Sequence, residues 1–191
     1  MINISVRDLQ RVTRELQDTN KKAETFMART MSDAKKRGPG WIAQGVAEEY
    51  KTTRKAVTSG KPILGICLGM QMLGLCSEEG HSAGLGCLPF SMRRFHLEDH
   101  PELKVPHMGW DRVEIMQPEA SLVQGLEQPA RFYFVHSYYA VCEDPKDVLM
   151  ECDYGVRFAA AVHRGNVWGV QFHPEKSHRF GLQLLTSFSR G

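Results

Sequence analysis

The sequence lacks the long apolar runs and the strong net charge that mark several large classes of protein. No apolar run approaches the length of a membrane span, and the first fifteen residues contain charged side chains where a secretion signal would be apolar. The formal net charge is only +2 over 191 residues, which gives no reason to expect binding to nucleic acid or to a membrane. We therefore expect a cytoplasmic protein.

The sequence also lacks the cysteine pairs of a disulfide framework or a zinc site. Its five cysteines are odd in number and none forms a Cys-x-x-Cys pair; they are Cys67, Cys76, Cys87, Cys142 and Cys152. The eight histidines are scattered without metal-ligand spacing. These patterns fit a reducing compartment, and they predict neither a metal nor a cofactor.

Length and patterning predict a single domain over residues 1–191, with a divergent first third. Residues 1–60 carry 12 Lys and Arg against 7 Asp and Glu, a net of +5, whereas residues 61–191 carry 12 against 15, a net of −3. Apolar residues recur at three- and four-residue steps in the first part, which is typical of helices. The second part predicts helices at 68–75 and 177–189, a loop at 105–110, and strands at 62–67, 92–95, 112–115, 131–142 (interrupted at its polar centre), 148–152, 157–163 and 168–172.

Cys67 lies in a segment with the form of a nucleophile elbow. The apolar run Pro62-Ile63-Leu64 is followed by Gly65-Ile66-Cys67-Leu68-Gly69, in which two glycines permit a tight turn between a strand and a helix. The N–H groups and dipole of that helix would favour a thiolate. An isolated cytosolic cysteine is most often a small buried hydrophobe, but two flanking glycines have little purpose in packing. We therefore predict that Cys67 is a nucleophile.

A base and a carboxylate stand two residues apart in Gln171-Phe172-His173-Pro174-Glu175. If the segment continues a strand, His173 and Glu175 face the same side. Glu175 would then orient one imidazole nitrogen while the other faces Cys67, as in a catalytic triad. The alternative is a histidine at a strand end and a solvated glutamate.

These two segments resemble those of the class I (triad) glutamine amidotransferases, in the extended forms Gly65–Gln71 and Gln171–Ser177. Within that family the chain is most similar to the glutaminase subunits of imidazole glycerol phosphate synthase. The similarity at that level lies in Gly84–Gly86, Lys104–Trp110 and Tyr133–Tyr139, and it is nearly continuous over residues 60–188.

The resemblance implies an α/β, flavodoxin-like fold with a mostly parallel sheet flanked by helices. It also implies hydrolysis of L-glutamine through a thioester on Cys67, with proton transfer by His173 and orientation of His173 by Glu175. The family positions that hold the substrate correspond here to Leu68, which supplies an oxyanion N–H, to Gln71, and to the backbone of His136, Ser137 and Tyr138. The ammonia would pass to a (β/α)8-barrel cyclase subunit in histidine biosynthesis, and the His107–Trp110 loop would lie near that partner.

The first 60 residues depart from the family pattern. They contain neither an Asp-Tyr-Gly-x-Gly-Asn-like turn nor a Pro-Gly-Val-Gly-like oxyanion loop. Pro39-Gly40-Trp41, which begins 28 residues before Cys67, is the one candidate for that loop, so Gly40 is the candidate second oxyanion donor. The N-terminal strands of the sheet are therefore expected to be incomplete.

Three other functions remain compatible with the sequence. A paralogous subunit would hydrolyse glutamine but supply ammonia to a sugar-modifying enzyme. A regulatory subunit would retain Cys67, His173 and Glu175 without a working oxyanion hole. A stand-alone cysteine hydrolase would leave the similarity of the partner loop unexplained.

Overall fold

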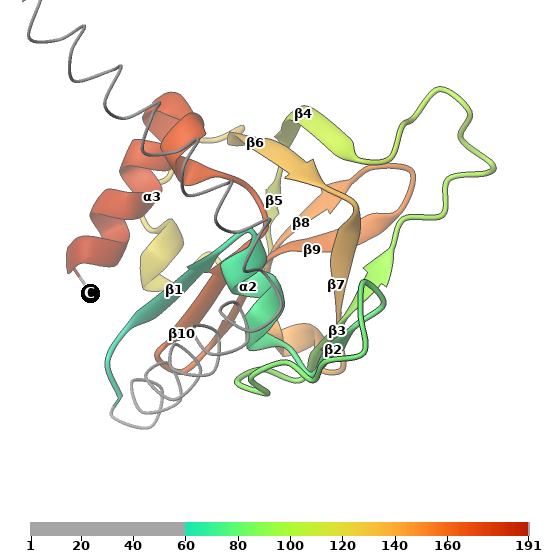
Figure 1. Cartoon of the computed structure of the whole chain (residues 1–191). Coiled ribbons are helices and arrows are strands. Elements are labelled where there is room, and N and C mark those ends of the chain that lie inside the picture. Colours follow the sequence, from blue (N-terminus) through green and yellow to red (C-terminus); the bar gives the residue numbers. More distant parts are fainter. Residues whose placement is uncertain (1–59, 191) are drawn as a thin grey trace, which may run out of the picture. The chain divides into compact units, whose positions relative to one another are not determined.

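The structure is a computed structural model that describes residues 60–190. The expectations for residues 1–59, including the helical segment and the Gly40 loop, lie outside the described residues. The strands and helices (Figure 1) are β1 Ile63–Ile66, α2 Leu68–Leu73, β2 Cys76–Ser77, β3 Phe90–Arg94, β4 His107–Arg112, β5 Glu114–Ile115, β6 Arg131–His136, β7 Tyr138–Cys142, β8 Val148–Asp153, β9 Arg157–Arg164, β10 Val167–Val170 and α3 His178–Arg190. No helix within residues 60–190 is long and apolar enough to cross a membrane.

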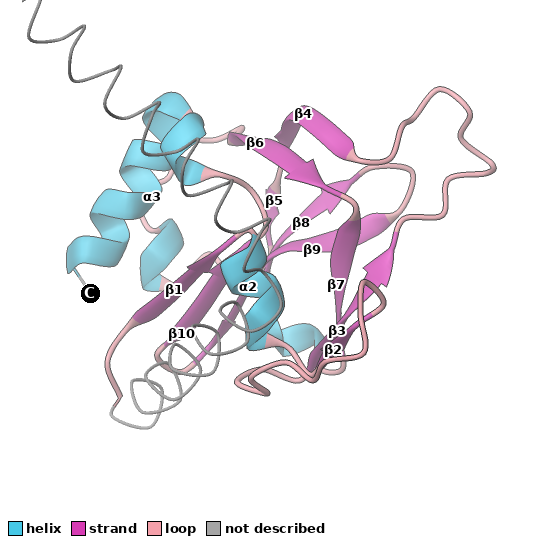
Figure 2. Ribbon diagram, in the orientation of Figure 1, coloured by secondary structure: helices cyan, strands magenta, loops and turns pink. Residues whose placement is uncertain are grey.

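The main sheet is mixed, and the expectation of a mostly parallel sheet is wrong for residues 60–190. The strand order is β1-β10-β9-β7-β3-β2, with β8 beside β9 and β5 beside β8 (Figure 2). Among the strands of residues 60–190, only β1–β10 and β2–β3 are parallel pairs. Short connections impose antiparallel pairing, as at Gly165-Asn166, which joins β9 to β10 with Gly165 at a φ of 61°. The α/β class itself is confirmed.

The segment 105–110, expected to be a loop, belongs largely to a strand. β4 and β6 form a separate antiparallel pair in which His107 faces His136 and Arg112 faces Arg131. The segment is poor in β-branched residues and contains Gly109, so it carries no strand signal of its own. The chain then changes sheets at Ser137, because β7 pairs with β3 and β9.

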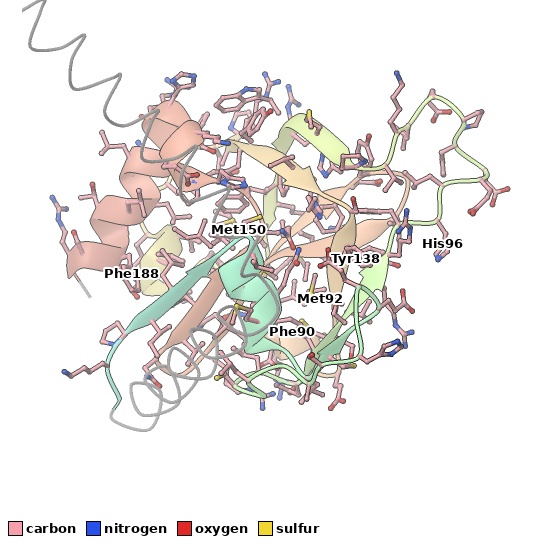
Figure 3. All side chains as sticks on the ribbon, in the orientation of Figure 1. Phe90, Met92, His96, Tyr138, Met150 and Phe188 are labelled. Atoms are coloured by element: carbon pink, nitrogen blue, oxygen red, sulfur yellow. The ribbon has the colours of Figure 1, made fainter. Side chains whose placement is uncertain are left out.

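Helices cover both faces of the β1–β10 strand pair. Gly65 lies opposite Gly169 in register. A Cβ at Gly169 would lie 2.8 Å from Cγ of Met70, a residue of α2. The helix α2 therefore packs on the face where these two glycines have no side chains. Trp168 and Val170 point to the other face, where their side chains join a core cluster that includes Phe180 and Leu184 of α3. Figure 3 shows Met150 inside this core, whereas His96 lies on the outlying loop between β3 and β4.

Gly65 allows the first turn of α2 to approach the sheet, and its replacement by alanine is expected to destabilise the fold. A Cβ at Gly65 would lie 2.7 Å from the backbone oxygen of Gly69 and 2.8 Å from Met70 N. Neither atom belongs to a flexible side chain, so we expect the free energy of unfolding to fall by about 2 kcal/mol or more, measured by urea denaturation.

Gly69→Ala is the matched control. A Cβ at Gly69 meets nothing within 4 Å, and alanine favours a helix, so stability should be unchanged or up to about 1 kcal/mol higher. Equal unfolding midpoints for Gly65→Ala and the unsubstituted chain would contradict the role of Gly65.

Candidate active site

Cys67 occupies the sharp turn between β1 and α2. Its backbone has φ 52° and ψ −111°, a conformation that costs a residue other than glycine about 1–3 kcal/mol. Its N–H donates to the carbonyl of Val170 at 2.8 Å, which continues the β1–β10 pairing into the turn. The strained turn projects the thiol at the end of the strands, as the elbow motif predicted.

The thiol of Cys67 is not activated in the way expected from the sequence. Burial raises the pKa of Cys67, and the hydrogen bond from the Leu68 N–H and the nearby Lys176 only partly oppose it. The negative charge of Glu175 raises this pKa further. The N–H at the start of α2 favours the thiolate as expected, but burial outweighs this effect, so the pKa of the thiol is raised overall. The thiol needs a base to remove its proton.

The side chain of Gln171 lies beside the sulfur, and the side chain of Gln71 is hydrogen-bonded to that of Gln171. Gln171 is fully buried, and its Nε2 donates to Cys67 Sγ at 3.8 Å. Gln71 Nε2 donates in turn to Gln171 Oε1 at 3.1 Å. Gln171 thus joins the predicted residue Gln71 to the thiol, and its own backbone N–H is held by the carbonyl of Ala160 at 2.9 Å.

His173 and Glu175 form a hydrogen-bonded pair just beyond the end of β10. His173 Nδ1 lies 2.7 Å from Glu175 Oε1. Partial burial acts to raise the pKa of Glu175, but the hydrogen bond to His173 and a backbone N–H outweigh it, so this pKa is lowered. The ionised carboxylate favours the tautomer in which Nδ1 carries the proton and Nε2 has the lone pair of a base.

The geometry of this pair differs from the strand that we expected. β10 ends at Val170, and Pro174–Lys176 is a 3-10 turn that begins after His173. The turn still brings Glu175 back to the imidazole, while Ser177 Oγ donates to the carbonyl of His173 at 2.6 Å. His173 Nε2 is buried and finds no hydrogen-bond partner among residues 60–190, as fits a nitrogen that awaits a reacting group.

Parallel pairing of β1 with β10 brings the two motifs together. Ile66 is in register with Val170, so Cys67 and Gln171 follow at the same edge of the sheet, although 104 residues separate them. His173 is held there by its N–H, which donates to the carbonyl of Tyr133 at 2.9 Å. The arrangement provides a thiol, a base whose Nε2 is unpaired within the described part of the chain, and a carboxylate that orients the base.

The other residues predicted to bind substrate differ in their exposure and in their hydrogen bonds. The Leu68 side chain is 60% exposed, while its N–H is directed at Cys67 Sγ. His136 is buried, and this burial lowers its pKa, whereas the Ser137 carbonyl accepts a hydrogen bond from the Phe95 N–H at 3.1 Å. The hydroxyl of Tyr138 accepts a long hydrogen bond of 3.4 Å from Arg94. Gly40 lies outside the described residues, so its role as an oxyanion donor stays a prediction.

The sequence analysis did not assign roles at the site to Gln171 and Ser177. Gln171 was visible in the motif, but only the tertiary structure places its amide beside the sulfur. Ser177 accepts a hydrogen bond from the Tyr133 N–H at 3.0 Å, so its hydroxyl joins β6 to the His173 carbonyl. The only indication of this role in the sequence was that Ser177 stands two residues after Glu175.

Comparison of the sequence with known proteins identifies a matching family and several relatives. The family model for "Glutamine amidotransferase class-I" matches residues 13–189. Imidazole glycerol phosphate synthase subunit HisH 2 of Pseudomonas aeruginosa is 52% identical over 136 residues, which are 71% of this chain and 66% of that protein. Subunit HisH of Synechococcus elongatus is 50% identical over 135 residues, or 70% of this chain and 61% of that protein. The matched part of the chain thus spans less than two-thirds of the length of these relatives.

Solved structures show a similar fold at low sequence identity. PurLQS from Thermotoga maritima superposes with a TM-score of 0.54 and 20% identity, over 74% of this chain and 66% of that chain. A glutamine amidotransferase from the same organism superposes with a TM-score of 0.52 and 19% identity, over 76% and 54% of the two chains. Because the family model covers most of the sequence, the chain belongs to the class I glutamine amidotransferase family.

Proposed function

We propose that this chain is the glutaminase subunit of imidazole glycerol phosphate synthase. It would hydrolyse L-glutamine to glutamate and ammonia through a thioester on Cys67, and would pass the ammonia to a (β/α)8-barrel cyclase subunit in the cytoplasm. The sequence relatives named as HisH subunits support this assignment. The site supports it through one observation above all, the thiol and the His173–Glu175 pair at one strand edge.

The proposed reaction assigns a task to each group at that edge. His173 Nε2 takes the proton of the Cys67 thiol as sulfur attacks the glutamine carboxamide, and then gives a proton to the departing ammonia. The Leu68 N–H stabilises the oxyanion that develops on the carbonyl oxygen. Water then attacks the thioester with His173 again acting as base, which releases glutamate and restores the thiol.

Exposed apolar side chains near the site fit a docked partner. Leu68, next to Cys67, and Met108, in β4, are each 60% exposed. β4 pairs with β6, whose Tyr133 holds the backbone of His173. A protein surface over these side chains would shield the thioester from bulk water and receive the ammonia.

The proposal predicts glutamine hydrolysis that depends on the partner. The full chain should form glutamate from glutamine slowly by itself, and the rate should rise at least about a hundredfold when a cyclase subunit and the ligand of that subunit are added. The reason is that docking would complete the oxyanion hole, and one donor is typically worth about 10² to 10³ in kcat. Glutamate release measured with and without the partner tests this.

Each rival function predicts a different result in this assay. Equal rates with and without the cyclase subunit would contradict the proposal and indicate a stand-alone hydrolase. Hydrolysis that responds only to a sugar-modifying partner would indicate the paralogous subunit. Absence of glutamate formation with every partner would indicate a regulatory subunit.

A further inference from the structure

A line of hydrogen bonds runs from the surface to the backbone of the His136–Tyr138 bend. Asp111 Oδ2 lies 2.8 Å from His107 Nε2, and His107 Nδ1 lies 3.1 Å from His136 Nε2. His136 Nδ1 lies 2.7 Å from the carbonyl oxygen of Tyr138. The line thus joins β4 to β6 and β7.

Two neutral imidazoles carry too few protons to make all three hydrogen bonds of this line. The carbonyl of Tyr138 can only accept, so His136 Nδ1 carries a proton and His136 Nε2 presents a lone pair. His107 Nδ1 must then donate to that lone pair. The ionised carboxylate of Asp111 also only accepts, so His107 Nε2 needs a proton as well. Three hydrogen bonds need three protons, one more than neutral His107 and His136 carry.

The surroundings of His107 favour the extra proton on this ring. His107 is 1% exposed and lies between two nearly parallel rings, Phe134 at 4.8 Å and Tyr154 at 3.9 Å between centroids. Aromatic faces attract a cation, and the Asp111 carboxylate supplies the opposite charge. The Asp111 side chain is 41% exposed, so its ionised form remains solvated.

Burial opposes this charge. It lowers the pKa of His107 below its usual value, and the hydrogen bond and charge of Asp111 oppose this only in part. The proton is therefore assigned from the hydrogen-bond geometry, in which two neutral rings leave one of the three contacts without a hydrogen. Burial also lowers the pKa of His136 to about 3, so His136 is neutral, and the extra proton that the three hydrogen bonds require lies on His107. The other titratable groups nearby are Tyr154, stacked on His107, and Cys152, whose pKa is raised in part by Asp111. Neither of them donates to His107 Nε2 in this structure, which leaves Asp111 as its partner.

The line ends on the bend that, by the family resemblance, would hold the glutamine of the proposed function. The Ser137 carbonyl is held by the Phe95 N–H, and the Tyr138 carbonyl is held by His136. The carbonyls of Ser137 and Tyr138 are therefore both held, and the second is held by a ring that His107 contacts. We infer that His107 carries protons on both ring nitrogens and that, with Asp111, it positions the His136–Tyr138 bend for substrate. The positioning role rests on the proposed function, whereas the protonation state does not.

Nitrogen-15 NMR of the imidazole rings tests the protonation state without substrate. At about pH 7, where an ordinary imidazole is mostly neutral, both His107 nitrogens should resonate as protonated. His136 should show a protonated Nδ1 and an unprotonated Nε2. In Asp111→Asn the amide N–H can donate to a lone pair on Nε2, so His107 should become neutral. An unprotonated His107 Nε2 in the unsubstituted chain would overturn the inference, whether or not the chain hydrolyses glutamine.

Steady-state kinetics with the partner present test the positioning role. Asp111→Ala removes one hydrogen bond from the line, and the KM for glutamine should rise about tenfold with little change in kcat. Asp111→Asn should recover most of the loss, because all three hydrogen bonds can form with a neutral His107. Glu114→Gln, which removes an exposed carboxylate paired with Arg157, is the matched control and should leave KM unchanged.

The outcomes separate this inference from the proposed function. If the unsubstituted chain forms no glutamate with any partner, the proposed function fails and the NMR result still decides the protonation state. If the chain is active and Asp111→Ala has the unsubstituted KM, the positioning role is wrong. An effect of Asp111→Ala on kcat alone would also contradict it.

Discussion

Replacement of Cys67 by alanine is expected to lower glutamine hydrolysis by about 10⁵-fold or more, because no other group at the strand edge can form the thioester. The variant should fold normally, since alanine is small and occupies the same positive-φ turn at a similar cost in strain. Glutamate formation by the partner-bound chain and the unfolding midpoint of the chain alone measure the two effects.

Cys76→Ala is the matched control. Cys76 is an exposed cysteine in β2, so its replacement should leave the rate of glutamine hydrolysis unchanged. A glutamine analogue with an electrophile in place of the carboxamide should add its mass to Cys67 alone. Labelling of Cys76 or Cys142 with Cys67 unmodified would refute the assignment of the nucleophile.

Loss of the base should be nearly as severe. In His173→Ala no imidazole remains to accept the thiol proton, and burial keeps the pKa of Cys67 above the ordinary value of 9.0, so the sulfur stays protonated near neutral pH. We expect kcat to fall by about 10⁴-fold or more. The residual rate should keep rising through pH 9 as the thiolate fraction increases, and a pH–rate profile measures this.

Glu175→Gln provides the comparison for His173→Ala. The amide oxygen can still accept from His173 Nδ1, so orientation is partly kept and kcat should fall less than in His173→Ala. A residual rate in His173→Ala that does not change with pH would contradict His173 as the base. An unchanged kcat in Glu175→Gln would remove the orienting role of the carboxylate.

Features that depend on neighbouring residues could be predicted from the sequence. The strand, turn and helix around Cys67 follow from an apolar run and a glycine at position 65 that admits the backbone of Gly69. The His173–Glu175 contact was also predicted, although through the wrong geometry, because a 3-10 turn brings residues i and i+2 together as well as a strand does. The amphipathic helix α3 was predicted from its apolar spacing.

Features that depend on distant pairing could not be predicted in this way. β4 forms because β6 offers its hydrogen bonds, and nothing in the composition of residues 107–112 signals that partner. The sequence also predicted an activated Cys67, but the raised pKa of this thiol reflects packing around it, which no local motif describes.

The sequence by itself determined the kinds of groups that this protein brings to its site and the turn that presents the thiol, since both depend on residues a few positions apart. The tertiary structure alone decided that Gln171 meets the thiol, that the buried Nε2 of His173 has no hydrogen-bond partner within residues 60–190, and that His107 contacts Asp111 and His136 together. These contacts depend on strand register and burial, and hydrogen bonds between segments about 30 or 100 residues apart leave no periodic trace in a sequence.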